Sequence, residues 1–248
     1  MILEEFKLEG KVALLAGDNP LGPGLASALA EAGADLALVG GDAGVLETEA
    51  AEVRRWGRKA VLVPADLARG RAVAAAVKKA LSQLGPIDIL VTNTAQGFAK
   101  PLGTVTEREW NRVLEANLKS VFLLTREVSR TMLERRKGRV VIIASALSVR
   151  GLPNSAVYCA SMAALHGLTD ALALEWAQVG IRINLVGPGW FQAPGQEPPP
   201  EQVLRWIPLR RAGKPEDLGA LVVYLASDSC DYMTGKAIFV DGGVLCRI

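Results

Sequence analysis

Residues 138–167 read GRVVIIASALSVRGLPNSAVYCASMAALHG, and the rest of the chain can be placed around them. The stretch begins with a β-rich apolar run, 140–144, that leads to Ser145. After a loop, Tyr158 opens a long apolar-periodic segment, which predicts a helix. A hydroxyl at the end of a strand and a phenol on the next helix can both point at one carbonyl or alcohol group. Ser145 and Tyr158 are therefore the first candidate site residues.

The composition bounds the class of protein. The chain has 248 residues, of which 50% are hydrophobic and 25 are glycine, so one α/β domain with a large core is expected. The net charge is +2 and the longest basic run is 135–137, which predicts no nucleic-acid or membrane partner. The three cysteines lack metal-ligand spacing, the N-terminus does not resemble a signal peptide, and no uninterrupted apolar stretch approaches about 18 residues. We therefore expect a cytoplasmic protein with a small-molecule substrate and no metal site.

Short apolar runs alternate with helical patterns along the whole chain. Strands are predicted at 11–16, 35–39, 60–63, 88–92, 139–145, 181–186 and 237–240. Helices are predicted at 22–34, 43–56, 71–84, 107–136 (as two consecutive helices), 156–179 and 215–227. This alternation predicts an α/β fold in a single domain, residues 1–248: a doubly wound, Rossmann-type parallel sheet of about seven strands with helices on both faces. Ligands of such sheets bind at the carboxyl ends of the strands.

The first predicted strand leads into a glycine-rich loop, AGDNPLGPG at 16–24. Its glycines, Gly17, Gly22 and Gly24, would let the backbone approach a pyrophosphate, and the following helix N-terminus would supply free N–H groups. Pro23 suits the first turn of a helix but removes one N–H group. A strand–turn–helix connection that binds nothing remains the alternative.

The order of these motifs resembles the short-chain dehydrogenase/reductase family, including its 3-oxoacyl-ACP reductase-like members. The family pattern is a Ser followed by Tyr-x-x-x-Lys, which Ser145 and Tyr158 match in their spacing. The stretch VTNTAQ, 91–96, resembles the family's Asn-Asn-Ala-Gly motif, and NLVGPG, 184–189, resembles its segment around the nicotinamide. The resemblance covers residues 11–243.

The resemblance implies hydride transfer between NAD or NADP and a carbonyl or alcohol carbon. Ser145 would polarise the substrate oxygen, Tyr158 would act as the general acid or base, and Asn117 would hold a water in a proton relay. The implied cofactor-binding residues are Gly17, Gly22, Gly24, Asp66, Asn93, Pro188 and Gly189.

Two further features follow from the same resemblance. A substrate lid would lie within the domain at 190–212, where Trp190, Phe191, Trp206 and Ile207 would make its inner side apolar. The alternative is that these aromatic side chains only pack the helix of the lid. The chain would form a homotetramer or a homodimer, with the apolar faces of the helices at 107–136 and 156–179 as the interfaces.

Each implied role has a simpler structural reading. Asp66 could be an ordinary N-cap or turn residue, because aspartate favours both places. Asn93 could satisfy backbone groups at the end of the sheet, which is the reading we prefer. Asn117 could fill a helix kink with a buried hydrogen bond, and this is compatible with the relay. Ser145 and Tyr158 could be a hydrogen-bonded core pair.

The chain departs from the family four residues after Tyr158, where Met162 replaces the expected lysine. A phenol has an ordinary pKa of about 10, and it needs a nearby cation to act as a base near neutrality. A lysine one helical turn away would supply that cation, whereas a thioether has no charge. His166, the only histidine, lies two turns away. Other cations would have to come from elsewhere in the chain, at Lys100, Lys119 or Lys214.

We therefore expect weak or absent oxidoreductase activity. The alternative is a catalytically inactive protein on the same fold, either a ligand or cofactor sensor or a non-catalytic partner in an oligomer.

The sequence does not choose between the two nicotinamide cofactors. The second predicted strand is followed by Gly40-Gly41-Asp42. A carboxylate there would bond the ribose 2′-hydroxyl, and an arginine would suit a 2′-phosphate. Asp42 comes slightly late for the first role and equally suits a helix cap, and no arginine is present for the second.

Overall fold

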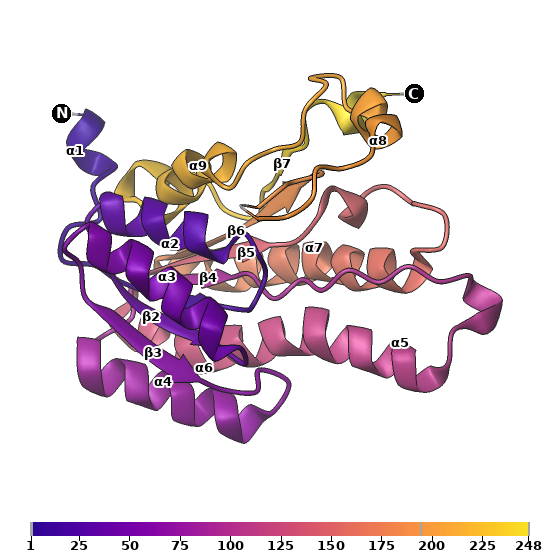
Figure 1. Ribbon diagram of the computed structural model, residues 1–248. Coiled ribbons are helices and arrows are strands. Elements are labelled where there is room, and N and C mark those ends of the chain that lie inside the picture. Colours follow the sequence, from indigo (N-terminus) through magenta and orange to yellow (C-terminus); the bar gives the residue numbers. More distant parts are fainter. Residues whose placement is uncertain (1, 194, 248) are drawn as a thin grey trace.

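Seven strands form one parallel sheet in the computed structural model, which describes residues 2–193 and 195–247 (Figure 1). Their order is β3-β2-β1-β4-β5-β6-β7, and all six neighbouring pairs are parallel. The strand bounds are β1 Val12–Ala16, β2 Asp35–Gly40, β3 Ala60–Pro64, β4 Ile89–Thr92, β5 Gly138–Ile143, β6 Ile181–Pro188 and β7 Ala237–Val240. The predicted fold class is confirmed. The order of strands reverses direction between β1 and β4, which is where such sheets bind ligands.

Helices cover both faces of the sheet. In Figure 1, α2, α3 and α9 lie on one face and α4, α6 and α7 on the other. The helix bounds are α1 Ile2–Glu5, α2 Gly22–Glu31, α3 Ala43–Arg55, α4 Gly70–Leu84, α5 Glu107–Leu114, α6 Ser120–Arg135, α7 Ala156–Trp176, α8 Glu201–Trp206 and α9 Glu216–Ala226. The helix α1 was not predicted. The segment predicted as two consecutive helices is one run, because a π-helical turn, Glu115–Lys119, joins α5 to α6.

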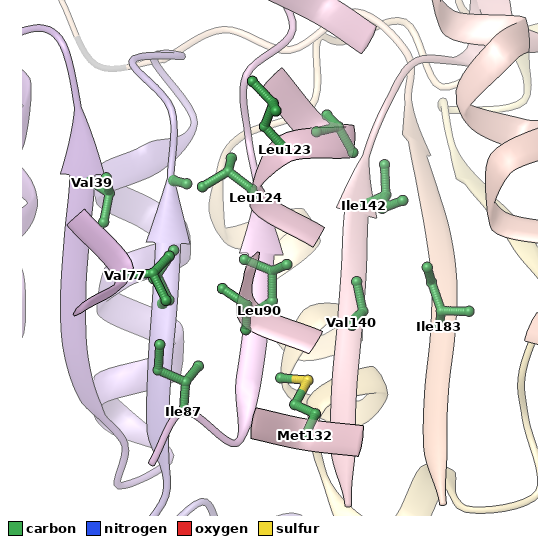
Figure 2. Close-up of a cluster of buried hydrophobic side chains, with 14 of the residues drawn as sticks. Val39, Val77, Ile87, Leu90, Leu123, Leu124, Met132, Val140, Ile142 and Ile183 are labelled. Carbon is green, nitrogen blue, oxygen red and sulfur yellow. The ribbon is translucent and has the colours of Figure 1, made fainter. Parts of the chain in front are cut away.

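Alternate side chains of the strands pack into two cores. In β1, Ala13 and Leu15 face α2, α3 and α9, whereas Leu14 and Ala16 face the opposite layer. Figure 2 shows part of the second core, in which Leu90 and Val140 of the sheet meet Leu124 of α6. Each fully buried leucine or valine stabilises the fold by about 1.5–3 kcal/mol relative to an exposed one. The two cores fix the sheet and so fix the edge at which the strands end.

The strand β5 ends earlier than predicted. It was expected to reach Ser145, but the ladder with β6 stops at Ile143. The cause is local: the Ser145 side chain accepts a hydrogen bond from the Leu147 backbone N–H (3.1 Å) and caps a short 3₁₀ turn, Ala146–Ser148. The chain therefore leaves the sheet just before the hydroxyl.

Among the described residues, one helical segment, Ala156–Val179, which is α7 with the 3₁₀ turn that follows it, is long and apolar enough to cross a membrane by length and composition alone. Its inner side chains, including Met162 and Leu165, are buried in the core against the sheet. Leu174, by contrast, is 84% exposed. The apolar residues of this helix thus lie partly in the core and partly on the surface.

Candidate active site

The hydroxyl groups of Ser145 and Tyr158 meet beyond the carboxyl end of β5. Tyr158 lies in the first turn of α7 and is half-buried, and its phenol lies close enough to the Ser145 side chain for that side chain to lower the phenol pKa. Both residues line a cavity of about 410 Å³, together with Pro188 and Gly189 at the end of β6. The fold therefore brings four of the candidate residues to one hollow. A larger groove of about 810 Å³ lies outside this site, between α2, α3 and α9.

The surroundings of Tyr158 keep its phenol protonated. Burial raises the pKa of the phenol above its ordinary value of 10, the hydrogen bond with Ser145 opposes that rise, and the neighbouring Cys159 adds to it. Among the described residues, no ammonium or guanidinium group contributes to this pKa. A deprotonated phenolate is therefore scarce at neutral pH.

The lysines that could have replaced the missing cation are engaged or exposed elsewhere. Lys100 pairs with Glu109 at 2.9 Å and Lys119 pairs with Glu115 at 3.0 Å. Lys214 is exposed in the segment before α9. None of the three supplies the charge.

Met162 occupies the position one turn beyond Tyr158 and is fully buried. It belongs to the core cluster on the α4, α6 and α7 side of the sheet, against which Tyr158 also packs. His166, a further turn along, is half-buried. The site thus has an apolar thioether at the place from which a lysine would act on the phenol.

Asn117 ties the loop after β4 to the start of α7. It sits in the π-helical turn Glu115–Lys119 and is fully buried. Its Nδ2 donates to the Gln96 carbonyl (3.0 Å) and to Ser161 Oγ (3.1 Å), and its Oδ1 accepts from the Gln96 backbone N–H (2.8 Å). Ser161 in turn donates to the Tyr158 carbonyl (2.7 Å). The buried hydrogen bonds expected of Asn117 are present, in a π-helical turn, and such single π turns are frequent at functional sites.

The glycine-rich loop is shaped by contact with the end of β4. Gly17 has a φ of +129°, and a Cβ there would overlap the Asn93 carbonyl oxygen, so only glycine fits. The Asn93 side chain is fully buried and donates to the Asn19 carbonyl (3.2 Å). Asn93 therefore joins β4 to the loop, which agrees with the structural role preferred from the sequence.

The start of α2 has few free N–H donors. Asn19 Oδ1 accepts from the Leu21 backbone N–H (3.1 Å), and the Asn19 carbonyl accepts from the Gly22 N–H (2.9 Å). Pro23 has no N–H, and Gly24 packs against Pro215 at the start of α9. The candidate residues Gly22 and Gly24 thus lie in the first turn of the helix, as predicted. However, Asn19 already accepts hydrogen bonds from two of the N–H groups that could otherwise bind a pyrophosphate.

A second cavity, of about 490 Å³, lies at the carboxyl ends of β1, β2, β3 and β4. Gly17 and Asp66 line it, as does Asp18, which the sequence reasoning did not single out. Asp42 has the capping role: its Oδ1 accepts from the backbone N–H groups of Gly44 (2.8 Å) and Val45 (3.2 Å) at the start of α3. The sequence offered one indication of this role: Asp18 is the only acidic residue in the glycine-rich loop, directly after Gly17.

Asp66 has the turn role that the sequence offered for it. Its Oδ1 accepts from the Ala68 N–H (3.0 Å) in an aspartate turn, while its Oδ2 pairs with Arg69 (2.9 Å). The residue nevertheless lines the second cavity. A turn residue and a ligand contact are therefore compatible here.

The segment predicted as a lid, 190–212, carries α8 and borders the Ser145 cavity. Trp190 lines this cavity and Ile207 is buried. Trp206 is 60% exposed and packs under the Arg247 guanidinium, 5.4 Å from the ring centroid. Trp206 thus does not contribute to the apolar inner side that was predicted for it. Pro194 lies outside the described residues.

Together these features fit a nicotinamide dinucleotide. One cavity has carboxylate acceptors for an adenosine ribose, and the other has a Ser–Tyr hydroxyl pair for a reacting oxygen. The glycine-rich loop between them admits close approach of a diphosphate, although with fewer free donors than a helix N-terminus usually offers. The fold and the site define a Rossmann-type α/β protein with a hydroxyl pair at a ligand cavity.

Comparison with known proteins gives the family. Residues 15–245 match the family model described as "Enoyl-(Acyl carrier protein) reductase". The chain is 37% identical to 2-dehydro-3-deoxy-D-gluconate 5-dehydrogenase of Dickeya dadantii over 255 residues, with 100% of both chains covered. It is 34% identical to a 3-oxoacyl-(acyl-carrier-protein) reductase of Staphylococcus epidermidis, covering 94% of this chain and 98% of the relative. The chain belongs to the short-chain dehydrogenase/reductase family.

The solved structures agree with this assignment. A short-chain type dehydrogenase/reductase from Mycobacterium marinum superimposes with a TM-score of 0.93 at 32% sequence identity, covering 100% of both chains. The family resemblance inferred from the motifs is therefore confirmed over nearly the whole chain.

Proposed function

We propose that this chain is an NAD(P)(H)-dependent oxidoreductase that acts slowly on a carbonyl or alcohol substrate. The observation that carries the proposal is the Ser145–Tyr158 hydroxyl pair at one cavity, beside Pro188 and Gly189. Ser145 would donate a hydrogen bond to the substrate oxygen, and Tyr158 would transfer the proton at that oxygen. Asn117 holds the loop after β4 against α7, the helix that carries Tyr158.

The cofactor would supply the hydride, and this chain's residues would hold it. Gly17, Gly22, Gly24, Asp66 and Asn93 would contact its adenosine and diphosphate parts, and Pro188 and Gly189 would contact the nicotinamide. Since the first N–H groups of α2 bond to Asn19 and Pro23 has none, we expect weaker dinucleotide binding than a fully free helix N-terminus would give.

The proton transfer would be slow because no cation of the described residues lowers the pKa of Tyr158: Arg150 lines the same cavity but does not contribute to that pKa. Burial raises the pKa of its phenol, and Met162 offers no charge to lower it. The turnover number would then fall below the range of about 1–1,000 s⁻¹ that is usual for enzymes.

The substrate side of the cavity favours an anionic molecule. Arg150 lines the same cavity as Ser145 and Tyr158, and its Nη1 donates to the Val244 carbonyl (2.6 Å). No carboxylate of the described residues lies within ion-pair distance of this guanidinium. Its remaining N–H donors could therefore bind a carboxylate group of the substrate. The relatives named 2-dehydro-3-deoxy-D-gluconate 5-dehydrogenase act by name on a sugar acid, in support of this class.

The absent cation also favours a second function, in which the chain binds a nicotinamide dinucleotide without turnover. Such a protein would serve as a cofactor or ligand sensor, or as the non-catalytic member of an oligomer. It would use the same two cavities but not the phenol.

One experiment separates these functions. NADH and NADPH are titrated into the pure protein and followed by nicotinamide fluorescence, and turnover is measured on small carbonyl compounds offered in matched pairs, each acid beside its neutral amide. We expect saturable binding, slow turnover, and faster turnover of the acid in each pair. Tight binding with no turnover would favour the sensor, and no binding of either nucleotide would contradict both functions.

We further propose that the chain forms a dimer or tetramer in the cytoplasm. Large apolar side chains are exposed along the two long helical segments, on Trp110 and Phe122 of one and on Leu174 of the other, where Leu174 is 84% exposed. Contact between copies would remove this surface from water. Sedimentation velocity at micromolar concentration should show a species of two or four chains, and a monomer alone would contradict the proposal.

A further inference from the structure

Asp18, in the loop between β1 and α2, places a carboxylate at the second cavity. Its side chain reaches across to the residues that follow β2: Oδ2 accepts from the Gly41 backbone N–H (2.9 Å) and Oδ1 accepts from the Asp42 N–H (3.2 Å). A Cβ at Gly40 would overlap Asp18 Oδ1. Gly40 and Gly41, at the end of β2, thus leave the place of a side chain empty, and the Asp18 carboxylate fills it.

The carboxylate remains open to a ligand. Asp18 is only partly buried and lines the cavity of about 490 Å³ at the strand ends. Each carboxylate oxygen can accept more than one hydrogen bond, so the two backbone contacts leave capacity for hydroxyl donors. Because these N–H groups hold the carboxylate in place, it is oriented before a ligand arrives.

The charge around this cavity is negative. Its lining contains the carboxylates of Asp18 and Asp66 but neither lysine nor arginine. Asp66 is paired with the exposed Arg69 (2.9 Å), whereas Asp18 has only backbone partners. A dianionic phosphate group placed beside Asp18 would therefore meet an uncompensated like charge.

A second carboxyl group lies behind the loop. Glu49 of α3 is fully buried without a hydrogen-bond partner among the described residues, and its carboxyl reaches the space beside Gly22. Burial, and then the charge of Asp18, raises the pKa of Glu49 to about 8. At neutral pH this group is neutral and at higher pH it becomes a second anion, so it never supplies a counter-charge for a phosphate.

We propose that Asp18 binds the adenosine ribose hydroxyls and repels a 2′-phosphate, so that this chain takes NAD(H) and not NADP(H). The general rule for dinucleotide sites is that a carboxylate bonds the 2′-hydroxyl and an arginine accommodates the phosphate. Here the carboxylate comes from the glycine-rich loop and not from the end of β2. The inference rests on the proposed function, in that it takes the site to hold a nicotinamide dinucleotide.

Binding measurements test this end of the site alone. Affinities of the pure protein for 5′-AMP and adenosine 2′,5′-bisphosphate, and for NADH and NADPH, are measured by calorimetry and nicotinamide fluorescence. We expect wild type to prefer the ligand without the 2′-phosphate by about tenfold or more in each pair, as one like-charge contact near a protein surface would give. Equal or tighter binding of the phosphorylated ligands would overturn the proposal.

Variants separate charge from loop structure. Asp18→Asn keeps the size of the side chain, and Asp18→Ser removes most of it; both should bring the two affinities within about threefold by strengthening NADPH and weakening NADH. Glu47→Gln, on the exposed side of α3 and paired with Arg54, is the control and should leave the ratio unchanged. If the Asp18 variants lost affinity for NADH and NADPH equally, Asp18 would only hold the loop in place, and the proposal would be wrong. Failure of turnover with the preference intact would count against the proposed function only.

Discussion

Replacing Met162 by lysine is expected to raise the turnover number for oxidation of an alcohol substrate by about a hundred- to a thousandfold. A cation one helical turn from Tyr158 would favour the phenolate. If it lowers the phenol pKa by about 3 units, the phenolate population rises about a thousandfold, which corresponds to roughly 4 kcal/mol. Steady-state rates of wild type and Met162→Lys on the same substrate measure the effect.

The buried position of Met162 sets the controls for this experiment. A lysine there would lay its alkyl stem in the place of the thioether and would have to bring its ammonium group to the cavity beside Tyr158. Met162→Leu, which changes shape but adds no charge, should leave the rate within about threefold. Thermal unfolding and dinucleotide titration confirm that each variant is folded. A folded, cofactor-binding Met162→Lys with no gain in rate would show that the missing cation is not the limiting factor.

The rate of alcohol oxidation by the wild-type protein is expected to rise about tenfold per pH unit between pH 7 and pH 9. In this direction Tyr158 must accept a proton, so only the phenolate is active. Because burial raises the phenol pKa above 10, the active fraction grows with pH throughout this window without reaching a plateau. Carbonyl reduction uses the protonated phenol, which predominates at every pH in the window, so its chemical step should stay flat.

Two controls assign this slope to Tyr158. The pKa of Glu49 is raised to about 8, within the same window, so rates are compared at saturating cofactor to remove any effect on binding. Tyr158→Phe should abolish the slope together with most of the activity. Met162→Lys should move the rise toward neutral pH. A plateau of the wild-type oxidation rate near pH 7 would mean that some cation already acidifies the phenol.

The fold was predictable because it depends on periodicity. Alternating apolar runs and helical patterns identified all seven strands and the doubly wound sheet, whereas the short helices α1 and α8 and the ends of several elements differed. The end of β5 was misplaced because the Ser145 side chain caps a turn, a bond that pattern alone does not reveal. Likewise, Asn117 was recognisable as an unusual helix residue, but its π-helical turn depends on Gln96 of a distant loop.

The sequence by itself determined that Ser145 follows a parallel strand, that Tyr158 lies at the start of the next helix, and that an uncharged residue lies one turn beyond the tyrosine. These facts follow from spacing along single elements, where 3.6 residues per helical turn fix which side chains are neighbours. Only the tertiary structure decided that no distant lysine supplies the missing charge and that Asp18, not Asp42, lies over the glycines after β2. Both outcomes depend on contacts between segments remote in sequence, because burial and charge at a site are set by every element that packs around it.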